Sequence, residues 1–119
     1  MATTNYLLGF DLGSSSIKVS LVNADTGALV TSAHSPGEEM TIMASRVGWA
    51  EQHPSEWWKH AILATHKVIE RAGVDGGSIL AIGIAYQMHG LVMVDKNQDV
   101  LRPSIIWCDS RAVGVGDKA

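Results

Sequence analysis

One carboxylate and a run of small polar residues lie close together near the start of the chain. Asp11 is followed two residues later by one glycine and three hydroxyl residues, which are Gly13, Ser14, Ser15 and Ser16. A turn this small and polar can direct several N–H groups and hydroxyls toward one point, which is how proteins hold phosphate groups. Asp11 is placed to hold a Mg²⁺ ion, or its bound water, beside that phosphate. The spacing is therefore compatible with a phosphate-binding turn with one catalytic, metal-binding carboxylate.

The same residues also fit an ordinary β-hairpin with a Gly-Ser turn, and spacing alone favours that simpler interpretation. Two common nucleotide-binding signatures, G-x-x-x-x-G-K-[ST] and G-x-G-x-x-G, do not occur in the sequence. Lys18 either adds positive charge near the anion or is a solvated strand residue. The residues by themselves leave these alternatives open.

A second group of polar residues follows the most apolar run in the chain. Residues 79–85 are apolar at every position, which predicts a parallel strand buried on both faces. Residues 86–90 come where this strand ends, and open α/β sheets bind ligands at the carboxyl ends of their strands. Met88 and His89 are therefore candidate binding residues, although His89 equally fits a histidine satisfied by nearby backbone.

Short strands and one helix are expected to position these residues. Residues 6–12, 17–23 and 28–33 are apolar or alternating and are separated by turn signals, which predicts an antiparallel meander. A helix that begins at Pro54 and is capped by Gly73 follows. The strand–helix–strand order places the apolar run beside the meander, so we expect an α/β fold with a mixed sheet flanked by a helix.

Several side chains have competing interpretations. We expect Trp57 and Trp58, on the apolar side of the helix, to lie in the hydrophobic core and His60 to face solvent. Trp49 is expected to pin the preceding irregular loop to the core. Glu51 is either a surface acid or a residue that reaches the active-site cleft, and spacing cannot decide between them.

The last third of the chain is expected to contain three more short strands. Residues 91–95, 100–101 and 104–107 are apolar runs separated by a turn or by a proline. Asp109 or Ser110 is expected to cap a helix that follows. Cys108 is interpreted as an inert core residue.

Composition limits the class of protein. The chain has 119 residues, 46% of them hydrophobic, with a formal net charge of −3, so we expect one globular domain and no nucleic-acid partner. A single cysteine fits a reducing compartment. Neither a signal segment nor a run of membrane length is evident, so a cytoplasmic protein with no membrane partner is expected.

Four ordered segments resemble known proteins. Residues 10–18 resemble the first phosphate motif of the actin-like ATPase superfamily. Residues 48–58, 82–90 and 101–111 then resemble, in order, the N-terminal part of the FGGY carbohydrate kinases. Gln87-Met88-His89-Gly90 is similar to xylulokinases in particular, whereas glycerol kinases carry Gln-Arg-Glu at that place. The resemblance covers essentially the whole chain.

The resemblance implies a ribonuclease-H-like domain that binds sugar, paired in the family with a second domain that holds most of the ATP site and the general base. It implies phosphate transfer from ATP, with Mg²⁺, to a hydroxyl of a ketopentose, D-xylulose giving D-xylulose 5-phosphate. Asp11 would hold the metal and residues 13–16, with Lys18, would face the ATP phosphates. The residues implied to contact the sugar, or to lie near or behind it, are Met88, His89, Trp107, Asp109 and Arg111.

Two departures from the family weaken the choice of sugar. Tyr86 stands where xylulokinases often have glycine, and Cys108-Asp109-Ser110 stands where Asn-Asp-Gly is commoner. Another sugar or polyol substrate, or a non-catalytic sugar-binding module, are the alternatives. The sequence predicts a helix that starts near Ala112 without room to finish, so we expect residues 1–119 to be a truncated N-terminal domain, inactive alone. A homodimer is compatible with this interpretation.

Overall fold

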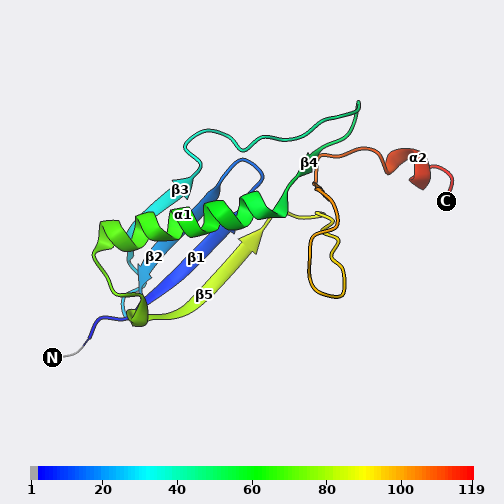
Figure 1. Cartoon of the computed structure of the whole chain (residues 1–119). Helices are drawn as coiled ribbons and strands as arrows, with labels where there is room; N and C mark the ends of the chain where they lie inside the picture. The colour runs from blue at the N-terminus through cyan, green and yellow to red at the C-terminus, as the bar shows by residue number, and fades with distance from the viewer. Residues whose placement is uncertain (1–2) are drawn as a thin grey trace.

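A four-stranded mixed sheet forms the main body of the molecule (Figure 1). The computed structural model describes residues 3–119. Strands β1 (Tyr6–Leu12), β2 (Ile17–Asn23) and β3 (Leu29–Ser35) form the predicted antiparallel meander, and β5 (Ile79–Tyr86) pairs in parallel with β1. The strand order is β3-β2-β1-β5. The expected mixed α/β fold is therefore confirmed.

Helix α1 (Pro54–Ala72) covers one face of this sheet. It begins at a proline and ends at Gly73, whose φ of 62° is the left-handed conformation that favours glycine. The alternating β2 side chains Ile17, Val19 and Leu21 are fully buried beneath the helix. The main core cluster combines strand and helix residues, namely Leu8, Val19, Leu21, Ala33, Ala64 and Val68.

The side of α1 that is buried differs from the predicted one. Trp58 is 70% exposed, whereas His60 is 8% exposed and shares a hydrogen bond of 2.8 Å with Ser35 through its Nδ1 and the serine Oγ. The predictions for Trp58 and His60 are therefore wrong. The stripe against the sheet contains small residues, Ala61 and Ala64, which let the helix approach the strands closely, and the larger side chains lie to one side.

Strand β5 pairs with β1 as expected, but the prediction that it is buried on both faces is wrong. It lies at the edge of the sheet, and Ile82 and Ile84 are 58% and 60% exposed. Among residues 3–119 no strand pairs with its second edge. Its uniformly apolar sequence is typical of a buried strand, so residues 3–119 leave an apolar surface exposed along β5.

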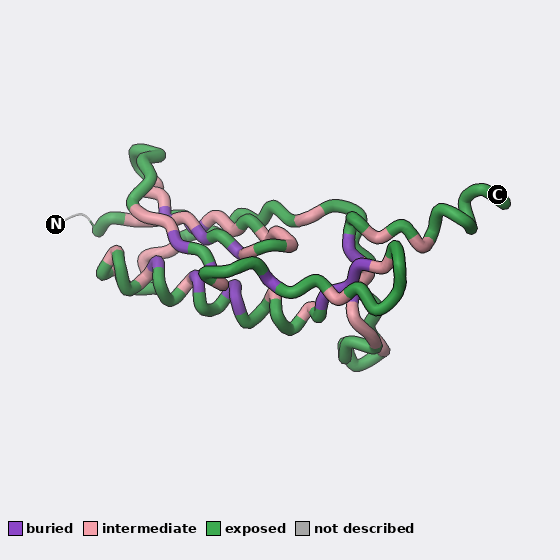
Figure 2. Tube along the Cα trace, turned by 90° about the horizontal axis from the view of Figure 1, so that it is seen from above, coloured by how far each residue is buried: buried purple, intermediate pink, exposed green. Residues whose placement is uncertain are grey.

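A second, two-stranded sheet lies beyond the end of the main sheet. It pairs β4 (Glu51–Gln52) with β6 (Ser104–Ile105), and buried positions gather here as well as under α1 (Figure 2). The 3₁₀ turn η1 (Gly76–Ser78) precedes β5, and helix α2 (Val113–Gly116) ends the chain. No helix within residues 3–119 has the length and apolar character needed to cross a bilayer.

Three expectations for the last third of the chain are corrected. The strands predicted at residues 91–95 and 100–101 are reduced to isolated bridges, Leu91 with Ile105 and Val94 with Val100. Cys108 is exposed. Helix α2 has Ala112 at its N-cap without a side-chain hydrogen bond, so neither Asp109 nor Ser110 caps it.

Candidate functional site

The serine turn between β1 and β2 lies at the end of the main sheet that faces the β4–β6 pair (Figure 1). Its own backbone closes it with one hydrogen bond, from the Gly13 N–H to the Ser16 carbonyl at 3.2 Å. A Cβ atom on Gly13 would lie 3.0 Å from that carbonyl oxygen, so the turn needs glycine at this position.

The three serine carbonyls of the turn are all occupied by protein donors. The Ser14 carbonyl accepts from Gln52 Nε2 at 2.6 Å, and the Ser15 carbonyl accepts from the Met40 N–H at 2.8 Å. No acceptor in residues 3–119 takes a hydrogen bond from the N–H groups of these serines. The turn therefore keeps free donors and engaged acceptors, which suits an anion.

Asp11 and Lys18 are exposed neighbours on the two strands that meet at this turn. They are cross-strand partners, on the sheet face opposite α1, and they line a shallow depression of about 500 Å³. In the described part of the chain, no three His, Cys, Asp or Glu residues cluster as a metal site. A lone carboxylate fits a Mg²⁺ ion, which usually keeps several waters and takes one or two carboxylates with substrate phosphates.

The segment after β5 runs alongside the serine turn. The Gln87 N–H donates to the Leu12 carbonyl at 3.0 Å, at the point where β1 ends, and the Leu91 N–H donates to Ile105 in β6 at 2.9 Å. Between these anchors, Met88 is 66% exposed and His89 has a φ of 61°. The backbone of this segment is therefore held between the end of β1 and β6, and the side chains of Met88 and His89 are open to solvent.

Trp107 connects the chain just after β6 to the serine turn. Its indole N–H donates to the Ser14 hydroxyl at 3.2 Å, across 93 positions of sequence, while the residue remains 55% exposed. Because the indole occupies an acceptor site on the oxygen, the hydroxyl proton of Ser14 is directed elsewhere. The structure thus brings together the predicted turn, the segment with Met88 and His89, and Trp107.

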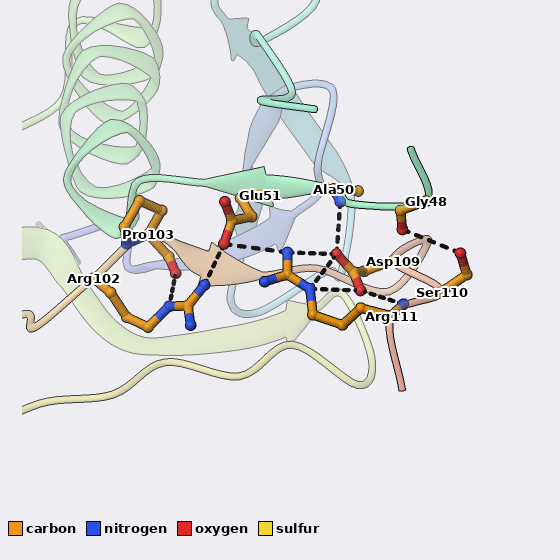
Figure 3. Close-up of polar contacts among 8 residues, drawn as sticks. All are labelled: Gly48, Ala50, Glu51, Arg102, Pro103, Asp109, Ser110 and Arg111. Carbon is orange, nitrogen blue, oxygen red and sulfur yellow. Dashed lines mark hydrogen bonds and ion pairs between the residues drawn. The ribbon is translucent and has the colours of Figure 1, made fainter. Parts of the chain in front are cut away.

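Asp109 and Arg111 belong to an ion-pair network that also includes Glu51 and Arg102 (Figure 3). Both carboxylate oxygens of Asp109 accept from the Arg111 guanidinium, at 2.7 to 3.0 Å, and one also accepts from the Ala50 N–H at 2.7 Å. Arg111 stacks 3.7 Å above the centre of the Trp49 ring. It also pairs with Glu51 at 3.2 Å, and Glu51 is paired a second time by Arg102.

This network fixes protonation as well as position. Hydrogen bonding from Arg111 holds the pKa of Asp109 well below its usual range, and the same bond raises the pKa of Arg111. The Asp109 side chain is only 2% exposed. Both oxygens of Asp109 therefore already accept hydrogen bonds from the protein.

Sequence reasoning missed several residues that support the site. Glu51 is 7% exposed and paired with both Arg102 and Arg111, so it is not a surface acid. Gln52 is 2% exposed and was not identified at all, although it contacts the turn. The contacts join positions 38 or more residues apart, so no local spacing signalled them.

The mixed sheet in the order β3-β2-β1-β5, covered on one face by α1, is an α/β fold of the ribonuclease-H-like class. The FGGY family of carbohydrate kinases, N-terminal domain, matches residues 6–118, and the chain belongs to this family. It is similar to xylulose kinase of Escherichia coli (strain K12), with 38% identity over 106 residues, covering 87% of this chain and 20% of that protein.

Two solved structures show the same similarity in three dimensions. A xyloylose kinase from Brucella ovis superposes with a TM-score of 0.87 and 32% identity, over 96% of this chain and 23% of that one. A gluconate kinase from Lactobacillus acidophilus gives 0.86 and 26%, over 98% and 22%. The chain thus spans about a fifth of the length of the relatives it matches.

Proposed function

We propose that this chain is the sugar-binding N-terminal part of an ATP-dependent kinase of a ketopentose, with D-xylulose as substrate and D-xylulose 5-phosphate as product. The single observation that carries the proposal is the donor-rich serine turn lying beside Met88, His89 and Trp107. The similarity to xylulose kinases supports the choice of sugar. The similarity to a gluconate kinase structure makes another sugar of the same family the second candidate.

The chain's residues fit the groups that such a reaction needs. The free N–H groups of residues 14–16 would hold ATP phosphates, and the Asp11 carboxylate would hold Mg²⁺ through its water shell. The bound metal would neutralise charge on the phosphates. Lys18 would add a second positive charge on the same face. Met88, His89 and the Trp107 ring would bind and orient the sugar between the turn and β6.

The direct test is a coupled assay of ADP release. It is run on the longest protein that the gene encoding this chain produces, called the long product below. D-Xylulose is expected to give turnover, and a panel of pentuloses, hexuloses, polyols and gluconate would show whether it is preferred. The 119-residue chain alone is expected to give no turnover, because the general base of the family is not among the matched segments. Turnover by the short chain, or none with any sugar by the long product, would overturn the proposal.

A substitution at His89 distinguishes an effect on sugar binding from an effect on ATP binding. His89→Ala in the long product is expected to raise KM for the sugar about tenfold or more and KM for ATP by less than about twofold, because one lost polar contact is worth ~1.4 kcal/mol. The matched change is His66→Ala, because His66 is exposed on α1, which covers the sheet face opposite Asp11 and Lys18, and this change should leave both constants unchanged. Equal effects of His89→Ala on both substrates would contradict its assignment.

A further inference from the structure

We propose that Gln52 is a positioning residue for the phosphate-binding turn, and that it works by holding the Ser14 carbonyl away from the anion. The inference rests on the proposed role of the turn and adds a residue with no contact of its own to either substrate. Gln52 lies in β4 and is 2% exposed. Its side-chain amide lies between two groups, the Ser14 carbonyl and the Trp57 indole.

The orientation of this amide is fixed by chemistry. The Trp57 indole N–H is only a donor, and it donates to Gln52 Oε1 at 2.9 Å. The amide nitrogen must then face the Ser14 carbonyl, to which Nε2 donates at 2.6 Å. In the reversed amide, Nε2 would face the Trp57 indole N–H, donor against donor, and Oε1 would face the Ser14 carbonyl, acceptor against acceptor. Both hydrogen bonds would be lost in a buried site.

Removing a carbonyl from an anion site has a clear electrostatic value. A carbonyl oxygen carries partial negative charge, so one that pointed at a phosphate would oppose the attraction of the neighbouring N–H groups. The Ser15 and Ser16 carbonyls are tied by backbone donors, whereas the Ser14 carbonyl is tied by the Gln52 side chain. Gln52 is thus the point at which a single substitution would free an acceptor in the turn.

The first test measures anion binding by the 119-residue chain without any catalysis. Tripolyphosphate is titrated into the ¹⁵N-labelled chain, and the amide shifts of Ser14, Ser15 and Ser16 are followed. Gln52→Met keeps the length of the side chain and removes both polar groups of the amide. It is expected to weaken binding about fivefold or more. Trp57→Phe removes the donor that orients the amide and keeps an aromatic ring against Ile17, Met40 and Ala61, and it should weaken binding about twofold to threefold.

Trp58→Phe is the matched control. Trp58 is the next residue of α1, is 70% exposed and makes no hydrogen bond within residues 3–119, so this change should leave binding as it is. Equal binding by Gln52→Met and the wild-type chain would overturn the inference, and so would equal effects of Trp57→Phe and Trp58→Phe. Absence of any tripolyphosphate shift in the wild-type amides would overturn it as well.

A pH-dependent rescue separates positioning from general damage to the fold. Gln52→Glu loses the donor when its carboxylate is charged, but a protonated carboxyl donates to Ser14 and accepts from Trp57 as the amide does. Its binding defect relative to wild type should therefore shrink as pH falls from about 8 to about 5. The wild-type chain is measured at every pH as the reference, because tripolyphosphate titrates. The ionisable side chains that line the groove with Gln52 are Glu39, His53, Glu56 and His60, and they are the same in both chains.

The two proposals can fail separately. Wild-type tripolyphosphate binding that Gln52→Met weakens, without sugar phosphorylation by the long product, would refute the kinase and keep the positioning role. Sugar phosphorylation with KM for ATP unchanged in Gln52→Met would keep the kinase and refute the positioning role. A defect in Gln52→Glu that is constant with pH also counts against it.

Discussion

Asp109 shows how a charged residue can serve a site without facing it. Its carboxylate accepts from Arg111 and from the Ala50 N–H, so it ties the strand before α1 to the chain after β6. The β4–β6 pair carries Gln52, and Trp107 lies two residues after the end of β6. A charged pair that is nearly inaccessible is costly to break, because one partner is then left without its counterion. We therefore propose that Asp109 and Arg111 act by holding these segments in place rather than by touching a substrate.

Replacing the Asp109 carboxylate is expected to change how stability depends on pH. The hydrogen bond from Arg111 lowers the pKa of Asp109 in the folded state, whereas the unfolded value is about 3.9. The resulting stabilisation is present above about pH 4 and is lost as pH falls toward the folded pKa. Asp109→Asn should lower Tm at neutral pH and should reduce the fall in Tm between about pH 5 and about pH 3.

Thermal denaturation followed by circular dichroism measures this effect. Asp25→Asn is the control, because Asp25 lies in the exposed turn between β2 and β3 and makes no ion pair within residues 3–119. The same flattening in both variants would show that the Asp109–Arg111 pair is not its source.

At the scale of elements, the contact of α1 with the meander carries the core. The helix presents small residues to the strands, and Val68 is fully buried among Leu8, Val19 and Leu21. Burial of this kind depends on close packing, so a lost methyl group leaves a void that the neighbours fill only in part.

Val68→Ala is expected to lower the free energy of unfolding by about 2 kcal/mol, because two methyl groups leave the core at ~0.8 kcal/mol each and a small cavity remains. Urea denaturation measures the change. Val115→Ala on α2 deletes the same atoms from a side chain that is 71% exposed, and it should alter stability by less than about 0.5 kcal/mol. Equal losses in the two variants would contradict the packing described for α1.

The elements that sequence reasoning predicted correctly are those with local signals. The meander and α1 follow from alternation, turn residues, Pro54 and Gly73, which act within a few residues of one another. The serine turn was found for the same reason. The burial of His60 depends instead on Ser35, and the placement of Gln52 depends on Ser14, so both required knowledge of packing between distant segments.

At the scale of the whole molecule, the chain is elongated. Its principal extents are 65 × 30 × 26 Å and its radius of gyration is 17.6 Å, compared with about 13.5 Å for a compact domain of this length. An apolar groove of about 500 Å³ lies between α1 and β5, with walls that include Trp58, Ile62 and Ile84. An exposed apolar groove beside an unpaired strand edge favours association with another surface.

The 119-residue chain is therefore expected to self-associate. Sedimentation velocity should show an average mass that rises with concentration in the micromolar range. Ile84→Lys places a charge in the groove and should reduce association, whereas Val115→Lys on α2 changes an exposed valine outside the groove and should not. A chain that stays monomeric at high concentration would contradict this expectation.

The serine turn is four residues long, yet its shape is maintained from three remote places: a backbone amide at Met40, an amide side chain at Gln52 and an indole at Trp107. A synthetic hairpin of residues 6–23 would contain every group that we propose to face the phosphate and none of these three supports. Such a peptide would have the right composition and the wrong geometry. Transplanting the turn into another protein with its geometry intact would therefore require the scaffold around it.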